Sequence, residues 1–190
     1  MVPNVFVGCD ISKATIDVSL RAANRSRRQK QFLNTVAGHS SLISWITRSG
    51  TIVRVVIEAT GNYSLDLALS LDACSGTELM VANPSATRQF ARAQMRRSKT
   101  DRVDADMLAD FAERMEFVSW TPPEAAVLEL RGMSRRMQAL TTERTRERAR
   151  LHQAAATRTT SAIVINDIEV NIRHLERRLD VMLHQALRLI

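Results

Sequence analysis

The chain has 190 residues, 45% hydrophobic and 25% charged, which suits one globular domain with an extension or two small domains. Its net charge of +7, supplied almost entirely by arginine, favours a polyanionic partner such as nucleic acid. There is no apolar run long enough to span a bilayer, no signal peptide, and no Cys/His spacing typical of a zinc site. We therefore expect a cytoplasmic protein in which Cys9 and Cys74 are reduced core thiols.

The first 115 residues alternate between β-rich runs and helical spacing. In chain order the predicted elements are strands 5–10, 15–20 and 30–35, helix 39–49, strand 51–59, helix 61–76, strand 78–83, and helices 84–95 and 101–115. We expect Gly50 and Gly76 to end the first two helices, Pro84 to open the third and Thr100 to cap the fourth. This order, with its opening meander of three strands, predicts an α/β ribonuclease H-like mixed sheet with flanking helices. In that layout the first and fourth strands lie side by side.

Past Pro122 and Pro123 the strand signals stop, so we expect an α/β domain over 1–123 and a helical region over 124–190. Apolar residues at steps of four and three predict an antiparallel coiled-coil hairpin or an oligomerising coiled coil. They are Leu130, Met133, Met137 and Leu140, then Ile168, Ile172, Leu175, Leu179, Met182, Ala186 and Leu189. The second seam continues to the last residue, so we expect a longer protein or a packing surface outside this chain.

Acidic residues occupy three separate places on this fold. Asp10 and Glu58 lie near the ends of the two central strands, where sites in open α/β sheets are found. Asp101 and Asp104 are three residues apart on one helix and can face a common point, whereas we expect Asp106 and Asp110 to face solvent. Each acid alone also fits a structural role, such as a turn residue or a helix-start acid that complements the dipole.

Four carboxylates brought together need a counterion. Two of them about 4 Å apart repel by roughly 4 kcal/mol at an effective dielectric constant of about 20. An all-oxygen ligand set selects hard divalent ions, so we expect Mg²⁺, with Mn²⁺ as a substitute, held by Asp10, Glu58, Asp101 and Asp104. Two such ions can stabilise the attacking and leaving oxygens of a scissile phosphate.

Four stretches carry a family resemblance: "VGCDISKATIDV", "IEATGNY", "NPSATRQFARAQMRRSKTDRVDADMLA" and "WTPP". They resemble the DEDD insertion-sequence transposases, RuvC-like recombinases that include pilin-gene invertases and bridge-RNA-guided enzymes. The resemblance covers 5–123 almost continuously, and 124–190 is similar to the family's coiled-coil region in character.

The resemblance implies a RuvC-like catalytic domain whose four acids are Asp10, Glu58, Asp101 and Asp104. It implies magnesium-dependent cleavage and transfer of DNA strands in transposition, guided by a structured RNA. It also implies a homo-oligomer, a dimer or tetramer, assembled through the helical region, with no membrane association. Family members carry a further C-terminal domain with a reactive serine, which nothing here matches, so we expect this chain to hold half of a composite active site.

Basic residues and a glycine turn mark candidate nucleic-acid contacts, although such charge runs are also common on solvated surfaces. The candidates are Lys13, Thr60, Gly61, Asn62, Arg88, Arg92, Arg96, Arg97, Lys99, Arg102, Arg135 and Arg136. The backbone N–H groups after the fourth strand could hold a phosphate, and the arginines lie beside the proposed metals or along a helix. Composition does not distinguish RNA from DNA as the partner.

Three other functions remain open. A Holliday-junction resolvase would use the same four acids without a serine domain. An actin-like ATPase or sugar-kinase fragment would also end its first strand in an aspartate, but its phosphate turn would be rich in glycine and "DISKAT" has none. A non-catalytic nucleic-acid-binding or oligomerisation module would rely mainly on the heptad helix.

Overall fold

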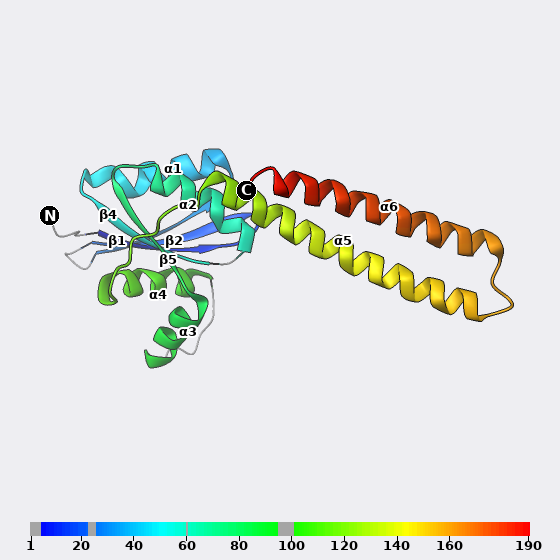
Figure 1. Ribbon diagram of the computed structural model, residues 1–190. Coiled ribbons are helices and arrows are strands. Elements are labelled where there is room, and N and C mark those ends of the chain that lie inside the picture. Colours follow the sequence, from blue (N-terminus) through cyan, green and yellow to red (C-terminus); the bar gives the residue numbers. More distant parts are fainter. Residues whose placement is uncertain (1–4, 23–25, 60, 95–100) are drawn as a thin grey trace. The chain divides into compact units, whose positions relative to one another are not determined.

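The computed structural model describes residues 5–22, 26–59, 61–94 and 101–190, apart from the side chains of Asn62, Asp101 and Arg102. The chain divides into two compact units, Met1–Pro122 and Pro123–Ile190, and each is described by itself (Figure 1). The first unit is built on a sheet, and the second consists of two helices.

The elements of the first unit are β1 (Val5–Ile11), β2 (Thr15–Ala22), β3 (Arg27–Leu33), α1 (Val36–Ile46), η1 (Thr47–Ser49), β4 (Val53–Glu58), η2 (Gly61–Ser64), α2 (Leu65–Asp72), β5 (Thr77–Ala82), α3 (Pro84–Ala93) and α4 (Asp101–Arg114). The sheet order is β3-β2-β1-β4-β5. β1, β2 and β3 form an antiparallel meander, and β1, β4 and β5 are parallel. The predicted α/β ribonuclease H-like fold is confirmed, with β1 and β4 adjacent at the centre of the sheet.

Some predicted boundaries were wrong. β3 begins at Arg27, earlier than expected, because its ladder with β2 continues to the pair Arg21 and Arg27. α2 ends at Asp72 instead of reaching Gly76, because residues 73–76 form a turn closed by Thr77, whose hydroxyl donates to the Cys74 carbonyl at 3.0 Å. Gly50 does end its helical segment, with a φ of 67°, and Pro84 is at the first turn of α3. Thr100 lies outside the described residues.

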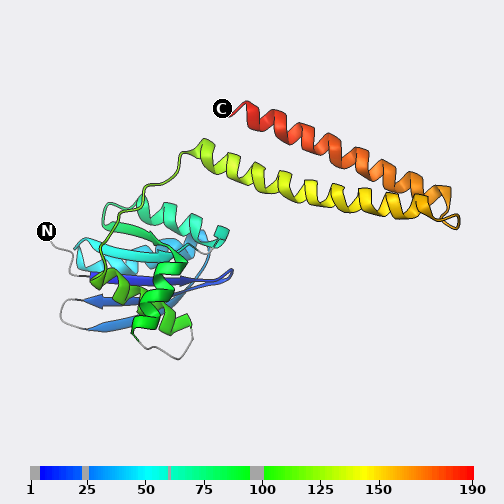
Figure 2. The same cartoon turned by 60° about the horizontal axis from the view of Figure 1, so that its bottom comes forward.

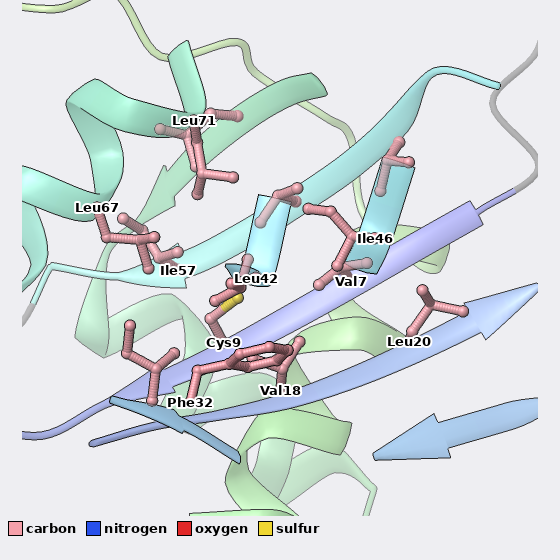
Figure 3. Packing of buried hydrophobic residues seen from close by; sticks show 14 of the residues in the cluster. Val7, Cys9, Val18, Leu20, Phe32, Leu42, Ile46, Ile57, Leu67 and Leu71 are labelled. Carbon is pink, nitrogen blue, oxygen red and sulfur yellow. The ribbon is translucent and has the colours of Figure 1, made fainter. Parts of the chain in front are cut away.

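The sheet has a different helical layer on each face. α1 and α2 cover one face, and α3 and α4 cover the other (Figures 1 and 2). Residues of β1 alternate between them: Val7 and Cys9 point into the core beneath α1 and α2, in the same cluster as Leu42 and Leu71 (Figure 3). The opposite core is smaller and contains Val56 of β4 with residues of α4.

Helix α4 lies unusually close to β1, and Gly8 makes this possible. A Cβ atom built on Gly8 would lie 2.2 Å from the Ala105 carbonyl oxygen, 2.3 Å from the Ala109 nitrogen and 2.6 Å from the Leu108 Cβ. Ala105 and Ala109 are themselves buried and small. The helix backbone can therefore rest almost directly on the strand, two residues before Asp10.

The second unit is a helical hairpin of α5 (Ala125–Ala156) and α6 (Ala162–Leu187), which run side by side in both views (Figures 1 and 2). Its seam contains Leu140, Ile172 and Leu175, all buried, as the apolar spacing predicted. The seam of α5 also contains Arg144, whose Nε is buried without a hydrogen-bond partner. No described helix is both long and apolar enough to cross a membrane.

The close crossing at Gly8 predicts a large effect from one methyl group. Gly8→Ala should lower the free energy of unfolding of the first unit by about 2–3 kcal/mol, because either the helix or the strand must move. Both tryptophans lie in this unit, so tryptophan fluorescence during urea unfolding measures it. The matched control is Gly132→Ala in α5, where a new Cβ would meet nothing within 4 Å. That change should stabilise the hairpin by about 1 kcal/mol in circular dichroism. Equal changes in the free energy of unfolding from the two substitutions would contradict the close contact between α4 and β1 at Gly8.

Candidate active site

Two carboxylates lie at the ends of the central parallel strands. Cys9 pairs with Ile57, so Asp10 and Glu58, the next residues, share one register position on β1 and β4. Both are half-buried. By strand alternation, Asp10 is on the same face as Gly8 and Glu58 on the same face as Val56, which is the face that α4 covers. The two acids are therefore neighbours on one side of the sheet.

Glu58 has a partner that sequence reasoning missed. The Thr87 hydroxyl lies 3.1 Å from Glu58 Oε2 and 3.2 Å from the Pro84 carbonyl oxygen, so its single proton is shared between two acceptors. Thr87 is fully buried in α3, and Asn83 caps that helix by accepting from the Ser85 N–H. The cap and the proline set the start of α3, which places Thr87 against the end of β4. The Glu58 carboxylate is thus positioned by a hydrogen bond from a hydroxyl group.

The other two predicted ligands begin helix α4. Asp101 is its first residue, with a side chain outside the described part, and Asp104 is half-buried one turn later. Asp104 immediately precedes Ala105, the residue that approaches Gly8 of β1. Among the described side chains, no group of three or more His, Cys, Asp or Glu is close enough to hold a metal ion. The four-acid ligand set therefore stays a prediction.

Asn34 ties together the two loops that follow the carboxylates. Its Nδ2 donates to the Ser12 carbonyl at 2.9 Å and to the Tyr63 carbonyl at 3.1 Å. The first loop follows Asp10 and the second follows Glu58. Asn34 Oδ1 in turn accepts from Nε2 of the buried His39, at 2.8 Å. This assigns the Nε2–H tautomer, because both amide hydrogens of Asn34 point at carbonyls. An asparagine after a strand gives no sequence signal of this role.

Asp106 and Asp110, predicted to face solvent, are buried, so that prediction was wrong. Arg21 of β2 forms ion pairs with Asp110 and with Asp106 Oδ1, the latter at 3.4 Å. Arg27 Nε reaches Asp106 Oδ1 at 2.8 Å, and the Ser19 hydroxyl donates to the same oxygen at 3.1 Å. The two acids are one turn apart on α4 and face β2, so they anchor the helix to the sheet. Their basic partners are about 80 residues away in the chain, which hid the pairing from the sequence.

The predicted nucleic-acid contacts are dispersed over the molecule. Arg88 and Arg92 are exposed one turn apart on α3, and Lys13 is exposed in the turn between β1 and β2. Gly61 opens η2 with a φ of 73°. Arg135 and Arg136 are exposed on α5. Thr60, Arg96, Arg97 and Lys99 lie outside the described residues, as do the side chains of Asn62 and Arg102.

The two cysteines differ in burial. Cys9 and Cys74 are both free; Cys9 lies in the core as predicted, whereas Cys74 is half-buried, so its placement in the core was wrong. Burial raises the pKa of the Cys9 thiol to about 12, and the nearby charge of Asp10 adds to the effect. Because a thiolate is the reactive form, Cys9 is an inert core residue.

The sheet order and the acidic ends of its two central strands define this unit as a ribonuclease H-like domain. A model of the transposase family DEDD_Tnp_IS110 matches residues 7–157. The chain belongs to this transposase family.

Two curated relatives are similar over nearly the whole chain. The pilin gene-inverting proteins of Moraxella bovis and Moraxella lacunata are each 27% identical to it over 192 residues. The matches cover 97% of this chain and 56% of each relative, so the chain spans about half the length of these relatives.

The buried ion pairs predict a large cost for removing Arg21. Arg21→Met takes away a guanidinium shared by Asp106 and Asp110, and should lower the free energy of unfolding by about 3 kcal/mol in urea titrations. The control is Arg54→Met, which removes a partly exposed pair with Glu78 at 2.9 Å and should cost about 1 kcal/mol or less. If the free energy of unfolding falls equally in the two variants, the ion pairs of Arg21 with Asp106 and Asp110 do not anchor α4.

His39 predicts a pH dependence of stability. Burial lowers its pKa below the ordinary 6.5, although the charge of Asp66 acts in the opposite direction. The unfolded ring binds a proton that the folded ring resists, so the free energy of unfolding should fall as the pH drops through about 6.5. His39→Gln, which keeps a donor towards Asn34, should flatten this part of the profile in urea titrations between about pH 5.5 and 7.5. A protein that becomes more stable on acidification, or a variant with an unchanged profile, would contradict the assignment.

Proposed function

We propose that the first unit is the carboxylate-bearing catalytic domain of a transposase, which cleaves and transfers DNA strands with the help of a divalent metal. The observation that carries the proposal is the shared register position of Asp10 and Glu58 at the ends of adjacent parallel strands, on the face covered by the helix of Asp104. Carboxylates from remote segments repel one another when they lie close together, and a bound divalent cation would offset that repulsion.

The donor set suits magnesium. The candidate ligands Asp10, Glu58, Asp101 and Asp104 offer only carboxylate oxygens, with no His or Cys among them, and this chemistry selects Mg²⁺ or Mn²⁺. When bound, the metal would supply charge stabilisation at the scissile phosphate. The chain's own residues would hold the ligands in place: Thr87 donates to Glu58, and α4 carries Asp104 on a helix fixed to the sheet.

Exposed basic residues around this face would hold the nucleic-acid backbone. We assign that role to Arg88 and Arg92 of α3 and to Lys13 and Gly61 in the loops after the two strands. The same proposal includes the predicted contacts outside the described part, which are Thr60, Asn62, Arg96, Arg97, Lys99 and Arg102. Arg135 and Arg136 on α5 would contact a structured guide RNA or the DNA.

The helical unit is proposed to assemble copies of the protein into a dimer or tetramer. Its support is apolar surface on α6, where Ile163, Val181 and Leu187 are 81%, 57% and 61% exposed. The relatives are inverting proteins and extend beyond the matched region. We therefore assign this chain the carboxylate-bearing part of a recombinase site that acts on DNA in the cytoplasm.

The double substitution Asp101→Asn/Asp104→Asn tests the metal site. Added Mg²⁺ or Mn²⁺ should stabilise the parent protein and not the variant, and metal affinity by calorimetry should fall at least about tenfold. DNA affinity in EDTA should be retained, which separates catalysis from binding.

The matched control is Asp72→Asn/Asp167→Asn, which removes two exposed acids elsewhere with the same change in charge. It should leave metal stabilisation intact. If the test variant binds metal as well as the control does, the catalytic proposal fails and a non-catalytic nucleic-acid-binding module becomes the better description.

A further inference from the structure

A pocket on the opposite face of the sheet from α4 has no role in the proposed active site. It has a volume of about 400 Å³ and lies between β3 and α1. It is lined by Lys30, Ser40, Ser41, Ser44, Trp45 and Arg48. We refer to these six residues as the β3–α1 pocket. Lys30 and Arg48 are exposed, so their charged groups are available at its rim.

The surroundings of the β3–α1 pocket are strongly basic. The sequence has no Asp or Glu between Asp17 and Glu58, a stretch that contains seven basic residues. Two of these, Arg21 and Arg27, form ion pairs with Asp106 on the α4 face of the sheet. Alternation along β3 puts Arg28 and Lys30 on the other face, with Phe32. The positive charge at the pocket is therefore not neutralised by acids of its own elements.

An aromatic surface accompanies this charge. Trp45 is half-buried and packs at 5.7 Å between ring centroids against Phe32. The Arg28 guanidinium carbon lies 5.7 Å from the centre of the Trp45 ring, and Lys30 Nζ lies 4.9 Å from that of Phe32. Cations placed over aromatic rings are held in position before any ligand arrives. The combination of cations with an accessible indole is suited to a phosphate next to a base or sugar.

We propose that the β3–α1 pocket binds the phosphodiester backbone of a nucleic acid, RNA or DNA, at a second site separate from the carboxylates. Lys30 and Arg48 pair with phosphates, and Trp45 packs against the adjoining base or sugar. The hydroxyls of Ser40 and Ser41 donate to the Val36 and Ala37 carbonyls, so the charged groups supply the main donors. Because α1 and α4 cover opposite faces of the sheet, this site holds a nucleic-acid segment away from the proposed point of cleavage.

The test uses the intact chain with Trp120→Phe, which leaves Trp45 as the only tryptophan. It is titrated in EDTA with single-stranded and duplex oligonucleotides of RNA and, in a separate arm, of DNA. Trp45 fluorescence should change on binding and return on addition of salt. Lys30→Glu/Arg48→Glu should abolish the change and weaken binding on the order of tenfold at low salt. The arm that responds identifies the nucleic acid.

A second measurement keeps Trp120 and follows labelled oligonucleotides by anisotropy. Reversing the charges of Lys30 and Arg48 should make the fall of log affinity with log salt concentration less steep, by about two in slope, one for each lost phosphate contact. The control is Arg114→Glu/Arg158→Glu, two exposed arginines elsewhere with the same charge change. This control should change the steepness of the slope less. Equal losses in both variants, or no change in Trp45 fluorescence in either arm, would overturn the proposal. EDTA keeps this result independent of the metal site.

Discussion

The close packing of helix α4 on strand β1 is the constraint on which the rest of the first unit depends. Gly8 lets the Ala105 and Ala109 backbone rest on the strand, where any side chain would collide with it. Asp110 and Asp106 then anchor the same helix through Arg21. Since Asp104 is on this helix and Asp10 is two residues beyond Gly8, the crossing determines how near these two acids can lie. The proposed catalytic site therefore depends on the contact between α4 and β1.

Much of the fold could be predicted from the sequence because its signals are local. The β-branched run ending at Glu58 and the meander before it indicate the sheet order, and Pro84 marks the start of α3. The seam of the hairpin follows from the spacing of Ile172 and Leu175. Boundaries were less accurate, as with β3, because hydrogen bonding to β2 extended a basic stretch that resembles a linker.

The supporting contacts of the candidate site could not be predicted, because each joins residues that are distant in sequence. Thr87 and Glu58 are 29 positions apart, and Arg21 and Asp106 are 85 apart. Asn34 joins two loops through backbone carbonyls, which carry no residue-specific signal. The burial of Asp106 was misjudged for the same reason. The sequence alone does not show that an arginine distant in the chain pairs with this acid. The choice of the four candidate ligands rests on sequence pattern and family, whereas their support comes from the fold.

The most direct test of the central claim is a crystal structure of the protein soaked in Mn²⁺, with anomalous scattering used to locate the ion. We expect an anomalous peak bounded by the carboxylates of Asp10, Glu58 and Asp104, on the α4 face of the sheet. A peak elsewhere, or none at a concentration that saturates metal binding in solution, would contradict it.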